Sequence, residues 1–204
     1  MGTLEAAHCA TAVSQQFPNV RLALMVGIGA GIPGLPKRGI RLGDLAVSIP
    51  QDGHSGVIQY DFVKYEQGRE LVKRHPLKRV ILSITKNQGF ERPHKDDILF
   101  DESFFHVNKG SDCSECEAAG SDHVIPREPR RDHQPVVHRG LIISGNGVVK
   151  NPQEQRSLKR DQTDAICFEM EAAGIIDENP CLIVRGICDY ADTSAFSIYH
   201  FEIF

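Results

Sequence analysis

The sequence predicts an α/β protein with a mostly parallel or mixed central sheet flanked by helices. Short apolar runs of strand length, such as 22–26 and 181–188, alternate along the 204 residues with segments of helical periodicity. That alternation is typical of a sheet covered on both faces. In such sheets ligands bind beyond the carboxyl ends of the strands, so the residues that follow each strand are candidates for a site.

The predicted elements follow one another in a regular order. Residues 2–17 place most apolar side chains on one helical face, and Pro18 ends that pattern. The unbroken apolar run at 22–26 predicts a strand that leads into a glycine-rich turn at 27–34. Further strands are expected at 44–49, 57–61, 136–144, 165–168 and 181–188, and further helices at 152–160 and 170–177.

The length is that of one domain. Residues 1–193 hold the strand and helix pattern. A long hydrophilic stretch at about 86–135 has no sustained periodicity and predicts a surface insertion that holds one helix and is partly mobile. Residues 194–204 break the pattern and are expected to form a divergent tail.

The bulk composition limits the partners and the location. A net charge of −4 is spread along the chain, and Arg127, Arg130 and Arg131 are interleaved with acidic residues, so we expect a solvated loop there and no nucleic-acid partner. No apolar run approaches the roughly 20 residues of a membrane span, and no signal-peptide pattern is present. We therefore expect a cytoplasmic protein with no membrane partner.

Two carboxylates follow the predicted strand at 165–168. Glu169 and Glu171 lie where the strand gives way to a helix, so backbone N–H groups and the helix dipole can hold a charged side chain in one orientation. A vicinal diol would suit such an acceptor. The alternative is that the glutamates only occupy the first helical turn, where acids are favoured for structural reasons.

Asp189 directly follows the apolar strand at 181–188, with Asp192 close behind. Partial desolvation at such a position raises the proton affinity of a carboxyl group, as a general acid requires. The alternative is an aspartate that caps the next helix.

Cysteine usage favours reduced thiols over a disulfide framework, because most of the six cysteines lie in apolar or helical contexts. Cys113 and Cys116 form a C-x-x-C pair with His123 and His133 downstream, which raises the alternative of a zinc site. The spacing to the histidines is irregular, whereas structural zinc sites show two well-formed ligand pairs. We therefore favour a reduced loop and expect no metal.

Five sequence blocks occur in a fixed order: VGIGAG at 26–31, RLGDLAVS at 41–48, ISG at 143–145, FEMEAAG at 168–174 and VRGICDYAD at 184–192. Together they resemble the purine nucleoside phosphorylase and nucleosidase superfamily, including its methylthioadenosine/S-adenosylhomocysteine nucleosidases. The resemblance covers about residues 2–193 and implies a three-layer nucleoside phosphorylase-like fold. The stretches at 59–62 and 185–192 are similar to the variant found as an N-terminal module of fungal NLR-like, ankyrin- or repeat-bearing proteins.

The resemblance implies a role for each matched residue. Glu171 matches the glutamate that binds the ribose hydroxyls, Asp189 the acid that protonates the leaving purine, and Arg185 a basic residue near that glutamate. Met170 matches the residue that packs on the sugar, and Phe168 a wall of the base pocket. The other expected substrate-binding residues are Glu169, Gly27, Ile28, Gly29 and Ala30. A carboxylate under the sugar and a proton donor at the base lower the barrier, because cleavage of the N-glycosidic bond builds positive charge on the sugar and negative charge on the base.

Departures from the family pattern favour hydrolysis over phosphorolysis. Phosphorolytic members place an Arg and a Ser around the first glycine to hold phosphate, and this chain has Met25 and Ile28 there. Val148 stands roughly where a base-stacking Phe is common. No cofactor is expected, and inorganic phosphate would be a co-substrate only in a phosphorolytic reaction.

The resemblance thus implies cleavage of the N-glycosidic bond of purine nucleosides or nucleotides by hydrolysis, in dimers or hexamers. The alternatives are a phosphate-dependent phosphorylase, a non-catalytic nucleoside sensor and an inactive fragment. Family members normally begin with a further strand and loops that supply the glutamate positioning the attacking water, and they end with a long helix. We expect both segments to be missing from this chain, which would be truncated at both ends.

Overall fold

The computed structural model describes residues 2–50, 55–60, 97–101, 103–105, 107, 114–131, 134–147, 158, 164–176 and 181–191. The helices are α1 (Thr3–Gln16), α3 (Ser114–Ala119) and α5 (Ala172–Ile176), with a 3₁₀ turn η1 at Ser121–His123. The strands are β1 (Ala23–Gly31), β2 (Leu45–Ser48), β3 (Val57–Gln59), β4 (Val137–Ser144), β5 (Ala165–Glu169) and β6 (Cys181–Asp189). Within these residues no helix is both long and apolar enough to cross a membrane.

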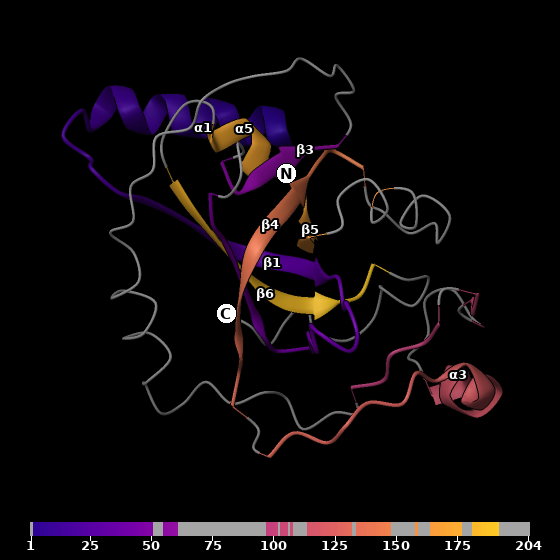
Figure 1. Ribbon diagram of the computed structural model, residues 1–204. Helices are drawn as coiled ribbons and strands as arrows, with labels where there is room; N and C mark the ends of the chain where they lie inside the picture. Colours follow the sequence, from indigo (N-terminus) through magenta and orange to yellow (C-terminus); the bar gives the residue numbers. More distant parts are fainter. Residues whose placement is uncertain are drawn as a thin grey trace.

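The strands form one mixed sheet in the order β2–β6–β1–β5–β4–β3, and β2 also pairs with β4. Because β2 has a partner on both edges, β2, β6, β1, β5 and β4 close into a ring. The β1–β6, β2–β4, β3–β4 and β4–β5 pairings are parallel, whereas β1–β5 and β2–β6 are antiparallel. In Figure 1, α1 and α5 lie together on one side of the sheet and α3 lies apart on another. The predicted α/β class with a mostly parallel or mixed sheet is confirmed.

The interior of the ring is filled by aliphatic side chains. One buried cluster draws Ala46 from β2, Ile142 from β4, Ile166 from β5 and Ile183 from β6, so it lies between the strands that form the ring. Neighbouring residues of β4 and β5 point the other way and build a second cluster, which includes Phe168. This alternation along each strand is what a sheet covered on both faces requires.

β1 continues through the glycine-rich segment, where the sequence predicted a turn. The strand runs to Gly31, and Gly27 pairs with Arg185 of β6. A Cβ at Gly27 would lie 2.1 Å from Nη1 of Arg185, and one at Gly29 would lie 2.5 Å from Sγ of Cys167. The predicted turn is therefore wrong for 27–31. These glycines make room for side chains of the neighbouring strands, a known use of glycine inside a strand.

The other predicted elements that fall on described residues are confirmed, with boundaries shifted by a few residues. They are the helices at 2–17 and 170–177 and the strands at 44–49, 57–61, 136–144, 165–168 and 181–188. The predicted helix at 152–160, apart from 158, and the tail at 194–204 lie outside the described residues.

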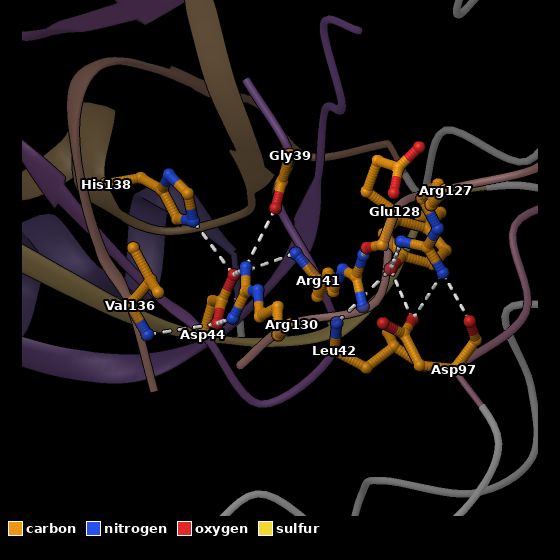
Figure 2. Close-up of polar contacts among 11 residues, drawn as sticks. Gly39, Arg41, Leu42, Asp44, Asp97, Arg127, Glu128, Arg130, Val136 and His138 are labelled. Carbon is orange, nitrogen blue, oxygen red and sulfur yellow. Dashed lines mark hydrogen bonds and ion pairs between the residues drawn. The ribbon is translucent and has the colours of Figure 1, made fainter. Parts of the chain in front are cut away.

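Arg130 anchors the described part of the predicted insertion, at about 86–135, on the sheet. Its guanidinium donates through Nη1 and Nη2 to the two carboxylate oxygens of Asp44, which has no exposed side-chain surface. The same carboxylate accepts from the backbone N–H groups of Arg41 and Val136, and Nε2 of His138 lies 2.8 Å from its Oδ2 (Figure 2). A buried carboxylate is thus surrounded by donors from three separate segments.

The prediction of a solvated loop is wrong for two of its three arginines. The side chain of Arg127 is 7% exposed and that of Arg130 is 17% exposed, and each forms an ion pair with an aspartate, Asp97 and Asp44 respectively. Arg131 is exposed, as expected. Buried arginines in proteins are normally paired, and here the partners lie outside the local stretch from which the loop was predicted.

Asp44→Asn tests the anchor between the insertion and the sheet. Burial raises the pKa of Asp44, but the hydrogen bonds from Arg130, His138 and the backbone outweigh it and lower the pKa to about 2. Because this value lies below the roughly 3.9 of an unfolded chain, the carboxylate stabilises the fold above about pH 4 and loses that effect as the pH falls towards 2.

We expect Asp44→Asn to lower the free energy of unfolding near neutral pH by about 3 kcal/mol, because Arg130 loses its buried counter-charge. Urea denaturation at a series of pH values measures this. The difference between wild type and variant should narrow between about pH 4 and about pH 2. A difference that stays constant over that range would contradict the assignment.

Candidate functional site

Arg185 of β6 is the centre of a buried ion-pair cluster. Its side chain is 4% exposed, and its Nη2 contacts Oε2 of Glu169, whose side chain has no exposed surface. The same Nη2 donates to Oε2 of Glu171 at 3.1 Å. One guanidinium therefore holds both glutamates that follow β5, and the missing Cβ of Gly27 gives it the space to do so.

Glu169 connects the end of β5 to the start of α5. Its carboxylate accepts from the backbone N–H groups of Glu171 at 3.0 Å and Ala172 at 2.9 Å. The next N–H, of Ala173, donates to Oγ of Ser144 at 2.9 Å. The sequence left open that the glutamates only occupy the first helical turn for structural reasons. The hydrogen bonds of Glu169 fit that alternative, because its carboxylate caps the first turn of α5. Because the carboxylate of Glu169 is fully buried, it would act on a ligand only indirectly, by orienting Glu171.

Glu171 is the more open of the two carboxylates. Its side chain is 21% exposed, and Arg185 holds its Oε2. The carboxylate therefore keeps one orientation while remaining accessible. Met170, between the two glutamates in the chain, is also partly buried.

Asp189 ends β6 in a constrained turn. Its Oδ1 accepts from the backbone N–H of Ala191 at 2.7 Å, and its Oδ2 accepts from Sγ of Cys188 at 3.1 Å. Ala191 is buried and has a φ of 54°, in the left-handed region that residues with a Cβ adopt at an energetic cost. The turn thus holds the carboxyl group of Asp189 in a defined direction at the end of the strand.

β1 lies between the two strands that carry the other predicted site residues, β5 and β6. Ala30 pairs with Phe168 of β5 on one edge and with Asp189 of β6 on the other, so these three side chains share one face. Gly27, three residues earlier, pairs with Arg185. At about 3.3 Å per residue, the levels of Arg185 and Asp189 are about 10 Å apart along β1.

The sequence analysis placed these residues at the carboxyl ends of mostly parallel strands, whereas β5 runs antiparallel to β1. β5 pairs with β1 at Ala30 and Gly31, so the end of β5 lies beside this part of β1. Ile28, another predicted site residue, is partly buried and packs against the interior cluster.

A cluster that the sequence analysis missed lies directly beside Asp189. The hydroxyl of Tyr190 donates to Oδ1 of Asp97 at 2.5 Å and accepts from Nη1 of Arg127 at 2.8 Å. Burial and the charge of Asp97 raise the pKa of Tyr190 well above its usual value, so the hydroxyl stays protonated. The only signal in the sequence was the position of Tyr190 next to Asp189, because Asp97 and Arg127 belong to the aperiodic stretch at about 86–135.

The described residues hold no group of His, Cys, Asp or Glu side chains placed to bind a metal ion. Two of the four residues considered for zinc, Cys113 and His133, lie outside the described residues. Of the other two, Cys116 is buried in α3, and Nδ1 of His123 lies 2.9 Å from Oδ2 of Asp101.

The chain is similar to part of a much longer protein. It is 37% identical over 218 aligned positions to a nucleotide-binding leucine-rich repeat (NLR)-like protein of Hyaloscypha variabilis, and the match covers 94% of this chain but 21% of that protein. The chain thus spans about a fifth of the length of this relative. No family model matches the chain.

Two solved structures share the fold of this chain. A 5'-methylthioadenosine/S-adenosylhomocysteine nucleosidase from Colwellia psychrerythraea 34H, in complex with adenine, matches with a TM-score of 0.54 at 15% identity over 96% of this chain and 65% of that one. A futalosine hydrolase mutant of Helicobacter pylori matches with a TM-score of 0.51 at 19% identity over 96% and 66%.

These matches confirm the fold that the sequence resemblance implied: the chain has the nucleoside phosphorylase and nucleosidase fold. The NLR-like relative agrees with the expected likeness to the variant found in fungal NLR-like proteins.

Arg185→Met tests the ion-pair cluster. Loss of the guanidinium leaves Glu169 as an uncompensated buried charge, so the free energy of unfolding in urea should fall by about 3 to 5 kcal/mol. The double variant Arg185→Met/Glu169→Gln should recover part of that loss, because neither charge is then left alone. The exposed Arg139 on β4 provides the matched control, Arg139→Met, which should change stability little. Equal losses in the single and double variants would contradict the pairing.

Proposed function

We propose that this chain binds a purine nucleoside or nucleotide and cleaves its N-glycosidic bond by hydrolysis, with Glu171 on the ribose hydroxyls and Asp189 as the general acid. The observation that carries the proposal is the arrangement along β1. Arg185, which holds the accessible Glu171, pairs with Gly27, and Asp189 pairs with Ala30 three residues further on, so the two strand levels that carry these groups are about 10 Å apart along β1. The Colwellia nucleosidase, which shares this fold, holds adenine.

Glu171 suits the sugar end of this span. Its accessible carboxylate can accept hydrogen bonds from two neighbouring hydroxyls, and Arg185 restricts its motion before the ligand arrives. As the glycosidic bond breaks, positive charge grows on the sugar. A fixed carboxylate next to that charge stabilises the transition state more than the ground state.

Asp189 suits the base end. The base leaves with negative charge, and a proton from a carboxyl group held in one direction neutralises it. The backbone N–H of Ala191 fixes that direction, and Phe168 on the same face offers an apolar wall for a flat ring.

The residues around the first glycine support water rather than phosphate as the nucleophile. Sδ of Met25 lies 3.4 Å from Nη2 of Arg185, and Ile28 packs against the interior cluster. Neither side chain has a hydrogen-bond donor for a phosphate oxygen.

A nucleoside sensor is the second candidate, since the chain matches only 21% of its NLR-like relative. In that case the same residues bind the ligand without turning it over, and other parts of a longer protein respond. The two candidates therefore differ in turnover and not in the bound ligand.

Base release from adenosine, inosine, guanosine and methylthioadenosine, followed by chromatography with and without phosphate, tests the proposal. We expect release that needs no phosphate and that falls about 100-fold or more in Asp189→Asn and in Glu171→Gln, because each removes a group that acts in the transition state. The exposed Glu117 in α3 gives the control variant, Glu117→Gln, which should be as active as wild type.

Other outcomes separate the alternatives. A phosphate requirement would select the phosphorylase, and nucleoside binding by calorimetry without base release would select the sensor. Base release that is unaffected by both active-site substitutions would contradict the assigned roles.

A further inference from the structure

Tyr190 ties the turn that carries Asp189 to the insertion. Its side chain is buried, and its hydroxyl lies within hydrogen-bonding distance of three groups: Oδ1 of Asp97, Nη1 of Arg127 and the backbone N–H of Leu42 at 3.2 Å. Leu42 precedes β2, whereas the other two partners come from the insertion. The residue next to Asp189 is thus held by two segments that are remote from it in sequence.

The partners of the Tyr190 hydroxyl are themselves fixed. Nη2 of Arg127 lies 3.0 Å from Oδ1 of Asp97, and the side chains are 7% and 11% exposed. Figure 2 shows Arg127 and Asp97 facing each other beside Leu42. The hydroxyl donates once and accepts from two donors, so its hydrogen-bonding capacity is filled in a buried environment, where such networks are rigid.

The turn itself needs support from its surroundings. Ala191 keeps its left-handed conformation only because neighbouring contacts hold it there, and its N–H is the donor to Oδ1 of Asp189. On one side Ala191 packs in the cluster that contains Phe168. On the other side the chain is fixed by Tyr190. If Tyr190 were released, the N–H of Ala191 and the carboxyl group of Asp189 would lose their mutual alignment.

We propose that Asp97 and Arg127 are positioning residues for Asp189, acting through the hydroxyl of Tyr190. The insertion then does more than cover the surface: its docking on the sheet sets the direction in which Asp189 faces the base. This inference rests on the proposed function for its catalytic consequence, but the structural link from Tyr190 to the Ala191 N–H is independent of any activity.

Tyr190→Phe in the full chain is the main test, because it keeps the ring and removes only the hydroxyl. Hydrogen–deuterium exchange at the backbone N–H of Ala191 reports on the turn directly, and we expect it to become at least about tenfold faster. Asp97→Asn should have the same effect. The matched control is Asp101→Asn, an identical substitution in the same segment at an aspartate that pairs with His123.

The catalytic consequence is measured on the same proteins. In Tyr190→Phe and Asp97→Asn we expect kcat for base release to fall about tenfold with KM little changed, since a displaced general acid slows the chemistry more than the binding. Arg127→Lys, which keeps a charged donor, should retain more of kcat than Arg127→Met. The pH dependence of kcat should also shift in the first two variants and not in Asp101→Asn, because the N–H bound to Asp189 is loosened.

Unchanged Ala191 exchange in Tyr190→Phe and Asp97→Asn would overturn the proposal, whatever the activity. So would faster exchange together with a wild-type kcat and pH profile. If the wild-type chain releases no base, the proposed function fails, while the exchange measurement still decides whether Tyr190 holds the turn. Circular dichroism and Tm, measured on every variant, ensure that folded protein is compared.

Discussion

The candidate site depends on the ion pairs that the buried guanidinium of Arg185 forms with two glutamates. Removing the charge of Arg185 from water is costly, and only well-placed carboxylates compensate it. Glu169 and Glu171 do so, and the absence of a side chain at Gly27 leaves the space that the guanidinium occupies. The carboxylate of Glu169 also accepts from the backbone N–H groups at the start of α5. The orientation of the accessible carboxylate is therefore a consequence of satisfying a buried charge.

The same rule holds the insertion on the sheet. Arg130 pairs with Asp44 before β2, and Arg127, paired with Asp97, donates to the hydroxyl of Tyr190, so two arginines attach one polar segment at two points. The second point lies next to the turn that carries Asp189. Stability of the docked segment and the geometry of the proposed acid are thus linked by the same hydrogen bonds.

The sequence predicted the strands wherever aliphatic residues ran without interruption, because burial on both faces leaves that signature. The strand prediction failed at 27–31, because glycines show no pattern of buried and exposed side chains. These glycines make room for side chains of neighbouring strands, which the local sequence does not reveal. Closure of the ring through β2 could not be predicted either, because it depends on pairings between distant segments. Likewise, Arg130 lies 86 residues from its carboxylate partner.

The roles assigned to the candidate site residues come from the family resemblance and not from their spacing. Spacing alone treated Glu169 and Glu171 alike, and burial now separates a capping carboxylate from an accessible one. A crystal structure with a purine nucleoside analogue that resists cleavage tests the proposed site most directly. The sugar hydroxyls should lie within hydrogen-bonding distance of Glu171, with the base between Asp189 and Phe168. An analogue bound elsewhere, or one with its base turned away from Asp189, would contradict it.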